Sequence, residues 1–441
     1  MRLLHTSDWH LGQTLHGFDR SAEQQFFLTW LLDQLVAQRI DALLISGDVF
    51  DQPNPSAEAQ RQWYQFLATA RLQLPRLDIV VIAGNHDSAA RLEAPAAVLQ
   101  PFGITVVGTV KYDASGALDT QRLVIPLHDA HGRCAAWCLA VPFLRFSDLP
   151  RRATATPAPP PAAANPTLFD PPHRELPATD AGYVRGVAAV YQQVTARAQA
   201  VRKADHALIA LGHCHMSGGQ VSADSERRLV IGGAEALPVE IFDKTISYAA
   251  LGHLHRAQLV GQHAHRRYCG SPLPLSFAEV NYQHQVLCIE LNGAQVDSIQ
   301  PIYVPRPVHL LRIPAQPAPL ATVLMQLREL QLPPQPIDAP PYLQVRVLLT
   351  APEPSLRVQI ETALQHQRVR LARIETTYAA SAAPAVDNYR SLDELERLLP
   401  QDVFAQLYQT RYATQPSAEL LNTFNELLAE VTAADFNSAA E

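Results

Sequence analysis

The chain has 441 residues, of which 47% are hydrophobic and 17% charged, a composition typical of a soluble globular protein with two or three domains. It contains no run of 18 apolar residues and no opening signal peptide, so we expect no membrane span and a cytoplasmic protein. Its five cysteines include no CxxC pair, which argues against both a disulfide framework and a thiolate zinc site.

The net charge of −7 is concentrated near the C-terminus. Residues 387–441 contain ten acidic side chains and three arginines, so the rest of the chain is formally neutral. A neutral body is not a general nucleic-acid-binding surface. Any affinity for DNA would therefore come from local patches, bound metals or a partner.

The first two thirds of the chain are predicted to alternate strands with helices. Apolar and β-branched runs predict strands at residues 3–6, 42–45, 79–83, 104–110, 122–127, 135–141, 206–211, 247–251 and within 257–304. Helical periodicity is found at residues 23–38, 57–70 and 181–202. From about 150 to 179 the composition shifts to Pro, Ala and Thr, which predicts a disordered insertion. We assign residues 1–304 to one α/β domain that contains this insertion.

Two further parts are predicted in the C-terminal third. A strand–helix–strand–helix–strand pattern within residues 305–380 predicts a small α/β domain without a metal-binding cluster. Residues 387–441 are predicted to be a helical tail, in which Ser391 and Glu394 form a capping box. The last helix has a one-sided apolar stripe made of Leu420, Leu421, Phe424, Leu427, Leu428 and Val431. Docking on its own domain and docking on a partner explain this stripe equally well.

Residues of metal-binding type follow five of the predicted strands. They are Asp8, His10, Asp48, Asn85, His86, His213, His253 and His255. Each motif alone is explained at least as well by turn chemistry, but strand ends are where open α/β sheets place their ligands, and the recurrence favours a site. Carboxylate, amide and imidazole groups without cysteine suit a pair of divalent cations that share Asp48 and hydrolyse a phosphoester. His215 has an equally good interpretation as a loop residue and is left out.

Taken in chain order, the motifs D-x-H, G-D-x-x-D, G-N-H-D, Gly-His and G-H-x-H resemble those of the calcineurin-like metallophosphoesterases. The flanks at residues 7–12, 47–51, 250–256 and 267–277 are similar to the SbcD family, the nuclease subunits of the bacterial SbcCD complex. The resemblance covers most of the chain apart from the insertion. It implies a mixed α/β (α+β) fold: a four-layer metallophosphoesterase β-sandwich flanked by helices, with a small α/β cap domain and a C-terminal helical tail.

The resemblance also implies a role for each candidate. A first cation would be held by Asp8, His10, Asp48 and His255, and a second by Asp48, Asn85, His213 and His253. His86 would protonate the leaving oxygen or stabilise transition-state charge, and Asp51 would orient His86. The segment Gly212-His213-Cys214-His215 departs slightly from a bare Gly-His, and we choose His213 because it directly follows the glycine.

The function implied is two-Mn²⁺ cleavage of DNA in repair, recombination and replication. It includes 3′→5′ exonuclease action on duplex ends and endonuclease action on single strands and hairpins, together with the ATPase SbcC and as an SbcD homodimer. The ligand types alone leave Mn, Fe and Zn open. Two alternatives are a stand-alone phosphodiesterase for small substrates and a metal-free scaffold that regulates SbcC. The α/β domain and tail count against the first, and the competent residue at every ligand position counts against the second.

Overall fold

The computed structural model describes residues 1–150, 178–220, 236–378, 400–412 and 414–425. The chain divides into two compact units, Met1–Val308 and His309–Glu441. Residues 151–177 of the predicted insertion, the predicted capping box of Ser391 and Glu394, and the last three residues of the apolar stripe lie outside the described residues.

The loops that carry Asp8, Asp48 and Asn85 follow strands of the first sheet of the larger unit. Its strand order is β12-β11-β1-β2-β3-β4, and β1 to β4 are parallel while β11 and β12 are antiparallel. The bounds are β1 Arg2–Thr6, β2 Ala42–Ser46, β3 Asp78–Ile82, β4 Ile104–Val107, β11 Gln285–Asn292 and β12 Gln295–Tyr303. Parallel strands buried on both faces explain the nearly continuous apolar runs in the sequence.

The second sheet has the order β5-β6-β7-β8-β10-β9, with β6, β7, β8 and β10 parallel. The bounds are β5 Val124–His128, β6 Cys134–Ala140, β7 Ala207–His213, β8 Tyr248–Gly252, β9 Gln258–Val260 and β10 His263–Tyr268. The carboxyl ends of β7 and β8 carry the three later candidate histidines. Packing of β2 against β7 and β8 brings these ends next to those of the first sheet.

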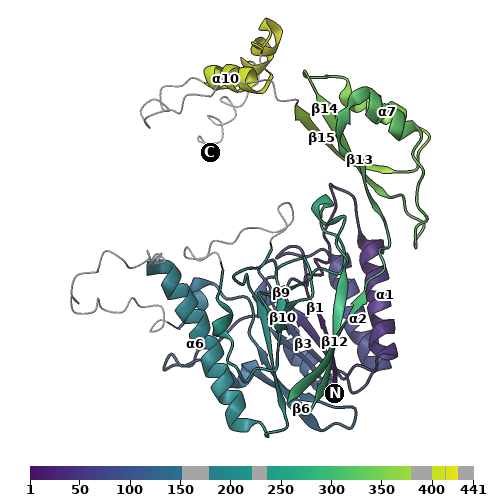
Figure 1. The fold of residues 1–441 in the computed structure, drawn as a ribbon. Helices are drawn as coiled ribbons and strands as arrows, with labels where there is room; N and C mark the ends of the chain where they lie inside the picture. The colour runs from purple at the N-terminus through teal and green to yellow at the C-terminus, as the bar shows by residue number, and fades with distance from the viewer. Residues whose placement is uncertain (151–177, 221–235, 379–399, 413, 426–441) are drawn as a thin grey trace, which may run out of the picture. The chain divides into compact units, whose positions relative to one another are not determined.

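Helices cover the outer face of each sheet. Helices α1 (Ser21–Ala37) and α2 (Ala57–Gln73) pack on the first sheet, and α6 (Ala178–Val201) packs on the second (Figure 1). The alternation along β2 explains the layers: Leu43 and Ile45 face α1 and α2, whereas Leu44 faces the second sheet. The order is helices, sheet, sheet, helix, so the predicted four-layer mixed α/β fold is confirmed.

The smaller unit is an independent α/β layer. Its parallel sheet has the order β13-β14-β15, with bounds Leu310–Pro319, Tyr342–Leu349 and Arg370–Tyr378. Helices α7 (Leu320–Arg328) and α8 (Leu356–Ala363) bury Val323, Leu327 and Ile360 against this sheet. The α10 helix (Pro400–Tyr412) and a helical segment at 418–425 follow, and the C-terminal helical region is therefore present.

Some predicted boundaries shift for local reasons. The strand expected at 104–110 ends at Val107. At the next residue, Gly108, a Cβ would lie 2.2 Å from the Ala89 carbonyl oxygen, so only glycine allows this crossing. The strand expected at 122–127 begins at Val124 after a 3-10 turn. No helix among the described residues is both long and apolar enough to span a membrane.

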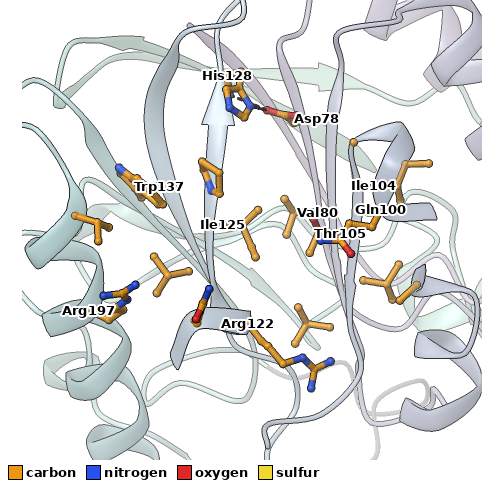
Figure 2. A pocket seen from close by; sticks show the side chains of 18 of the residues that line it. Asp78, Val80, Gln100, Ile104, Thr105, Arg122, Ile125, His128, Trp137 and Arg197 are labelled. Carbon is orange, nitrogen blue, oxygen red and sulfur yellow. Dashed lines mark hydrogen bonds and ion pairs between the residues drawn. The ribbon is translucent and has the colours of Figure 1, made fainter. Parts of the chain in front are cut away.

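The two sheets end in edge strands β4 and β5, and a cavity of about 680 Å³ lies beside them (Figure 2). Its floor is apolar and includes Val80 and Ile125, and the ion pair of Asp78 and His128 (3.0 Å) closes one end. None of the predicted site residues lines this cavity.

Candidate metal centre

All seven candidate ligands and His86 lie at the ends of strands from both sheets. The loop after β1 carries Asp8 and His10, the loop after β2 carries Asp48, and the loop after β3 carries Asn85 and His86. His213 is the last residue of β7, and His253 and His255 follow β8. Direct contacts join the groups: the amide of His253 donates to Asp8 Oδ1 (2.9 Å), and the amide of His86 donates to Asp48 Oδ1 (2.8 Å).

Backbone strain is concentrated at these loops. Asp8, His10, Asp48 and His253 have positive φ angles of 55°, 47°, 50° and 101°, a region that non-glycine residues rarely adopt. Each such residue costs on the order of 1–3 kcal/mol, and the surrounding packing must hold it in place. One support is Trp9, which is buried edge-on against Phe27 of α1 and anchors the loop between Asp8 and His10.

Three glycines of the motifs are required by close approach. A Cβ at Gly47 would lie 2.4 Å from His213 Nδ1, and one at Gly84 would lie 2.1 Å from Asp48 Oδ1. A Cβ at Gly252 would lie 2.0 Å from the Ser46 carbonyl oxygen. The Gly-Asp, Gly-Asn and Gly-His pairs therefore have a physical cause: only glycine lets the loops of the two sheets meet at this distance.

Asp48 lies at the centre of the cluster and is 2% exposed. Its Oδ2 atom lies 3.6 Å from His10 Nε2 on one side and 3.3 Å from His213 Nε2 on the other. One carboxylate thus faces both halves of the candidate site, as a bridge between two cations would require.

The first half of the cluster contains Asp8, His10 and His255, whose potential ligand atoms all lie within 4.8 Å of one another. His10 Nδ1 donates to Asp51 Oδ1 (3.2 Å), and His255 Nδ1 donates to Glu279 Oε1 (3.0 Å). Because a carboxylate can only accept, the proton of each ring is held at Nδ1, which leaves Nε2 with its lone pair for a metal.

The second half contains Asn85, His213 and His253. Asn85 Oδ1 lies 2.9 Å from His213 Nε2 and 3.1 Å from His253 Nδ1. His213 Nδ1 donates to the Ser46 carbonyl oxygen (2.8 Å), which again directs Nε2 toward Asp48. The His215 ring, whose centroid lies 6.4 Å from that of His253, is not among the described side chains that converge on Asp48.

His86 is half-buried beside the two halves of the cluster. Its ring packs edge-on against the His10 ring with centroids 4.8 Å apart, and burial lowers its pKa despite the nearby Asp48 carboxylate. The structure differs from the expected role of Asp51 in one respect. His86 Nδ1 donates to the backbone carbonyl oxygen of Asp51 (2.8 Å), whereas the Asp51 carboxylate binds His10. The main chain of Asp51 therefore contacts His86, and its side chain contacts His10.

Neighbouring charges and burial shift the pKa values of several groups in the cluster. Burial alone would raise the pKa of Asp48, but His213, His10 and His86 outweigh burial and hold that pKa well below its usual range. Burial opposes a charge on His213, yet Asp48 raises the pKa of this imidazole to about 9. Burial and the neighbouring His213 lower the pKa of His253 well below its ordinary value.

The donor set fits divalent cations. His10 Nε2 is buried and makes no hydrogen bond to any described residue, although it points into the cluster. A buried polar atom without a partner costs about 1–3 kcal/mol, a penalty that a metal bond would remove. Mixed carboxylate, amide and imidazole donors without thiolate suit Mn²⁺, Fe²⁺ or Zn²⁺.

Two buried acids that support the cluster were missed from the sequence. Asp87 accepts backbone N–H groups from Val49 (3.2 Å), Phe50 (2.9 Å) and Gly84 (2.9 Å), so it joins the loop of Asp48 to that of Asn85. Glu279 is fully buried and binds His255. Asp87 is the last residue of the G-N-H-D motif, so its position in the motif could have indicated a role. Glu279 belongs to no local motif.

Comparisons with known proteins show the family to which the chain belongs. Residues 1–257 match the family model described as calcineurin-like phosphoesterase, and residues 305–412 match the model described as Type 5 capsule protein repressor C-terminal domain. The chain is 39% identical over 406 residues to the SbcD subunit of the nuclease SbcCD from Rhodobacter capsulatus, covering 92% of this chain and 94% of the relative. It is 34% identical to the protein of the same name from Escherichia coli K12, covering 75% and 74%, and 34% identical to that from Bacillus subtilis, covering 66% of each.

Proposed function

The chain belongs to the calcineurin-like phosphoesterases and, within them, to the SbcD family of nuclease subunits, and from this premise we propose that it is an Mn²⁺-dependent DNA nuclease. It cuts duplex ends in the 3′→5′ direction and nicks single strands and hairpins, in DNA repair, recombination and replication in the cytoplasm. The observation that carries the proposal is Asp48, whose one carboxylate faces imidazoles from both sheets.

In this proposal, Asp8, His10, Asp48 and His255 hold one cation, and a second ligand set holds the other. That set consists of Asp48, Asn85, His213 and His253. The pair of cations would supply Lewis-acid activation of the phosphodiester and of a water molecule. The chain provides rings whose Nδ1 protons are held by fixed acceptors, as in His10, His213 and His255, so each Nε2 atom is already oriented for a cation.

His86 serves as the proton donor to the leaving oxygen, or stabilises the charge that develops on it. Its Nδ1–H is held by the Asp51 carbonyl oxygen, so the Nε2 atom is the one that can face a substrate. Burial lowers the pKa of His86, which makes its protonated form a better acid. Asp51 acts as a positioning residue for both His86 and His10.

We also propose the partners that the family suggests. Residues 305–380 would form a cap that guides DNA, and residues 387–441 would bind the ATPase SbcC. Within α10 the Leu407 side chain is 64% exposed, and Phe404 stacks on Phe424 with centroids 4.2 Å apart, which supports an apolar surface for a partner. The family also suggests a homodimer, which we include in the proposal.

The test compares DNA with a small ester. Purified chain with Mn²⁺ is given hairpin or plasmid DNA and, separately, bis-p-nitrophenyl phosphate, each with and without SbcC and ATP. Cleavage of DNA, increased by SbcC and ATP, is the expected result. If only the small ester is cut in every condition, the chain is a stand-alone phosphodiesterase and the proposal fails.

A further inference from the structure

A polar pocket of about 480 Å³ in the larger unit begins at Arg256, the residue after the candidate ligand His255. Two consecutive residues connect the pocket with the metal cluster: His255 belongs to the cluster, and Arg256 lines the pocket. The backbone at this point is fixed by Gly270, where a Cβ would lie 2.6 Å from the His255 carbonyl oxygen. The amide of Ser271 also donates to that oxygen (3.0 Å). The pocket wall and the metal cluster are therefore parts of one rigid loop.

The segment after Phe277 contacts both His255 and Arg256. Glu279 accepts from the His255 ring, and Tyr282, three residues later, lies under the Arg256 guanidinium at 5.7 Å from the ring centroid. The Tyr282 amide donates to the Glu279 carbonyl oxygen (2.9 Å). The half-buried Arg306 donates to the carbonyl oxygens of Val280 and Tyr282. This anchoring fixes the distance between the Arg256–Tyr282 pair and His255.

The side chains that line the pocket suit a ligand that combines a negative charge with a hydrogen-bonding ring such as a base. It contains Arg256 and Arg267 and no Asp or Glu among the described lining residues. One donor of Arg256 binds Gln220, and the Nε of Arg267 donates to the Ala264 carbonyl oxygen (2.6 Å), so further guanidinium donors remain for a ligand as far as the described residues go. Amide side chains such as Gln283 line the rest of the wall and can pair with base edges. Arginine and an aromatic face are the groups that hold single-stranded nucleotides.

We propose that this pocket holds the nucleotide next to the scissile phosphodiester of a single DNA strand, with its phosphate on Arg256 and its base against Tyr282. The choice of a nucleotide as ligand rests on the proposed nuclease function. The pocket supplies local positive charge on a body that is formally neutral, and its rigid link to His255 sets the register of the strand relative to the metals.

The test measures binding apart from cleavage. A short fluorescent oligothymidylate is titrated with the full chain in EDTA, where no cut occurs, and its affinity is read by fluorescence anisotropy. Arg256→Ala and Tyr282→Ala should each weaken binding about tenfold, and Tyr282→Phe should stay close to wild type. Arg256→Ala should also lower the salt slope by about 0.7, the value for one phosphate contact on a single strand. Arg133→Ala, which removes an exposed arginine from the β5–β6 turn, is the charge-matched control and should change nothing.

Equal affinities for wild type and Arg256→Ala, or no binding by wild type in EDTA, would overturn the pocket assignment. Failure of the nuclease proposal is a separate observation, namely that the wild-type chain with Mn²⁺ hydrolyses bis-p-nitrophenyl phosphate but leaves DNA intact. As a second readout, the ratio of oligonucleotide cleavage to small-ester hydrolysis should fall about tenfold in Arg256→Ala, mainly through KM. An equal loss on both substrates would mean that the change acts through His255 and would contradict the proposal.

Discussion

Replacing Glu279 by glutamine tests whether a buried carboxylate prepares His255 for metal binding. Glu279 is fully buried, its Oε1 accepts from His255 Nδ1 (3.0 Å), and its Oε2 accepts from the Leu275 amide (2.9 Å). An amide of the same shape has only one oxygen. If that oxygen stays on Leu275, the new NH₂ group meets His255 Nδ1 and moves the ring proton to Nε2, the atom that would bind the cation. If the amide flips, two donors oppose each other in a buried space.

Either orientation weakens the cation site. Changing the group that orients a metal-binding histidine typically costs about 10- to 100-fold in affinity. That range corresponds to about 1.4–2.8 kcal/mol. The assay is calorimetric titration of metal-stripped Glu279→Gln with Mn²⁺. Glu290→Gln is the matched control, because Glu290 is 41% exposed and pairs with Arg2 at the surface. Equal Mn²⁺ affinity for wild type and Glu279→Gln would refute the reasoning.

Four further predictions concern the proposed proton donor, the tail, the loop support and pH. His86→Ala should retain both cations by elemental analysis and lose most DNA cleavage; loss of a cation would show that His86 is a ligand. Deleting residues 387–441 should abolish co-purification with SbcC without changing metal content, and retained binding would place the partner surface elsewhere. Asp87→Ala leaves three buried N–H groups without their acceptor, so the metal-free unfolding temperature should fall by at least about 5 °C, and an unchanged temperature would contradict this role. Burial lowers the pKa of His5 to about 3, from 6.5, so the unfolded state binds one more proton between these values and stability falls as pH falls through that window. His5→Gln should reduce the pH slope of the unfolding free energy by up to about 1.4 kcal/mol per pH unit. Identical slopes for wild type and His5→Gln would contradict this prediction.

Much of the fold could be predicted because the strands are buried on both faces. Runs such as Leu43 to Ile45 and Ile79 to Ile82 are apolar without interruption, and the helices that precede these two strands, α1 and α2, have regular periodicity. Boundaries were less predictable where tertiary contacts decide them. The strand β4 ends just before Gly108, which crosses the Ala89 carbonyl oxygen, a neighbour that is invisible in the local pattern.

Convergence at the candidate site could also be predicted, because strand ends of parallel sheets meet at one edge and the five motifs share that position. The hydrogen-bond partners of each histidine ring could not be predicted. The contact of Glu279 with His255 joins residues 24 positions apart, and the carbonyl of Asp51, not its carboxylate, holds His86. A sequence motif specifies the side chain that acts, whereas a main-chain acceptor can be supplied by any residue type.

Anomalous diffraction at the manganese edge, from crystals soaked in Mn²⁺, tests the central claim most directly. We predict two peaks about 3.5–4 Å apart with the Asp48 carboxylate between them, one on the side of His10 and one on the side of His213. A single peak, or peaks that Asp48 does not touch, would contradict the account.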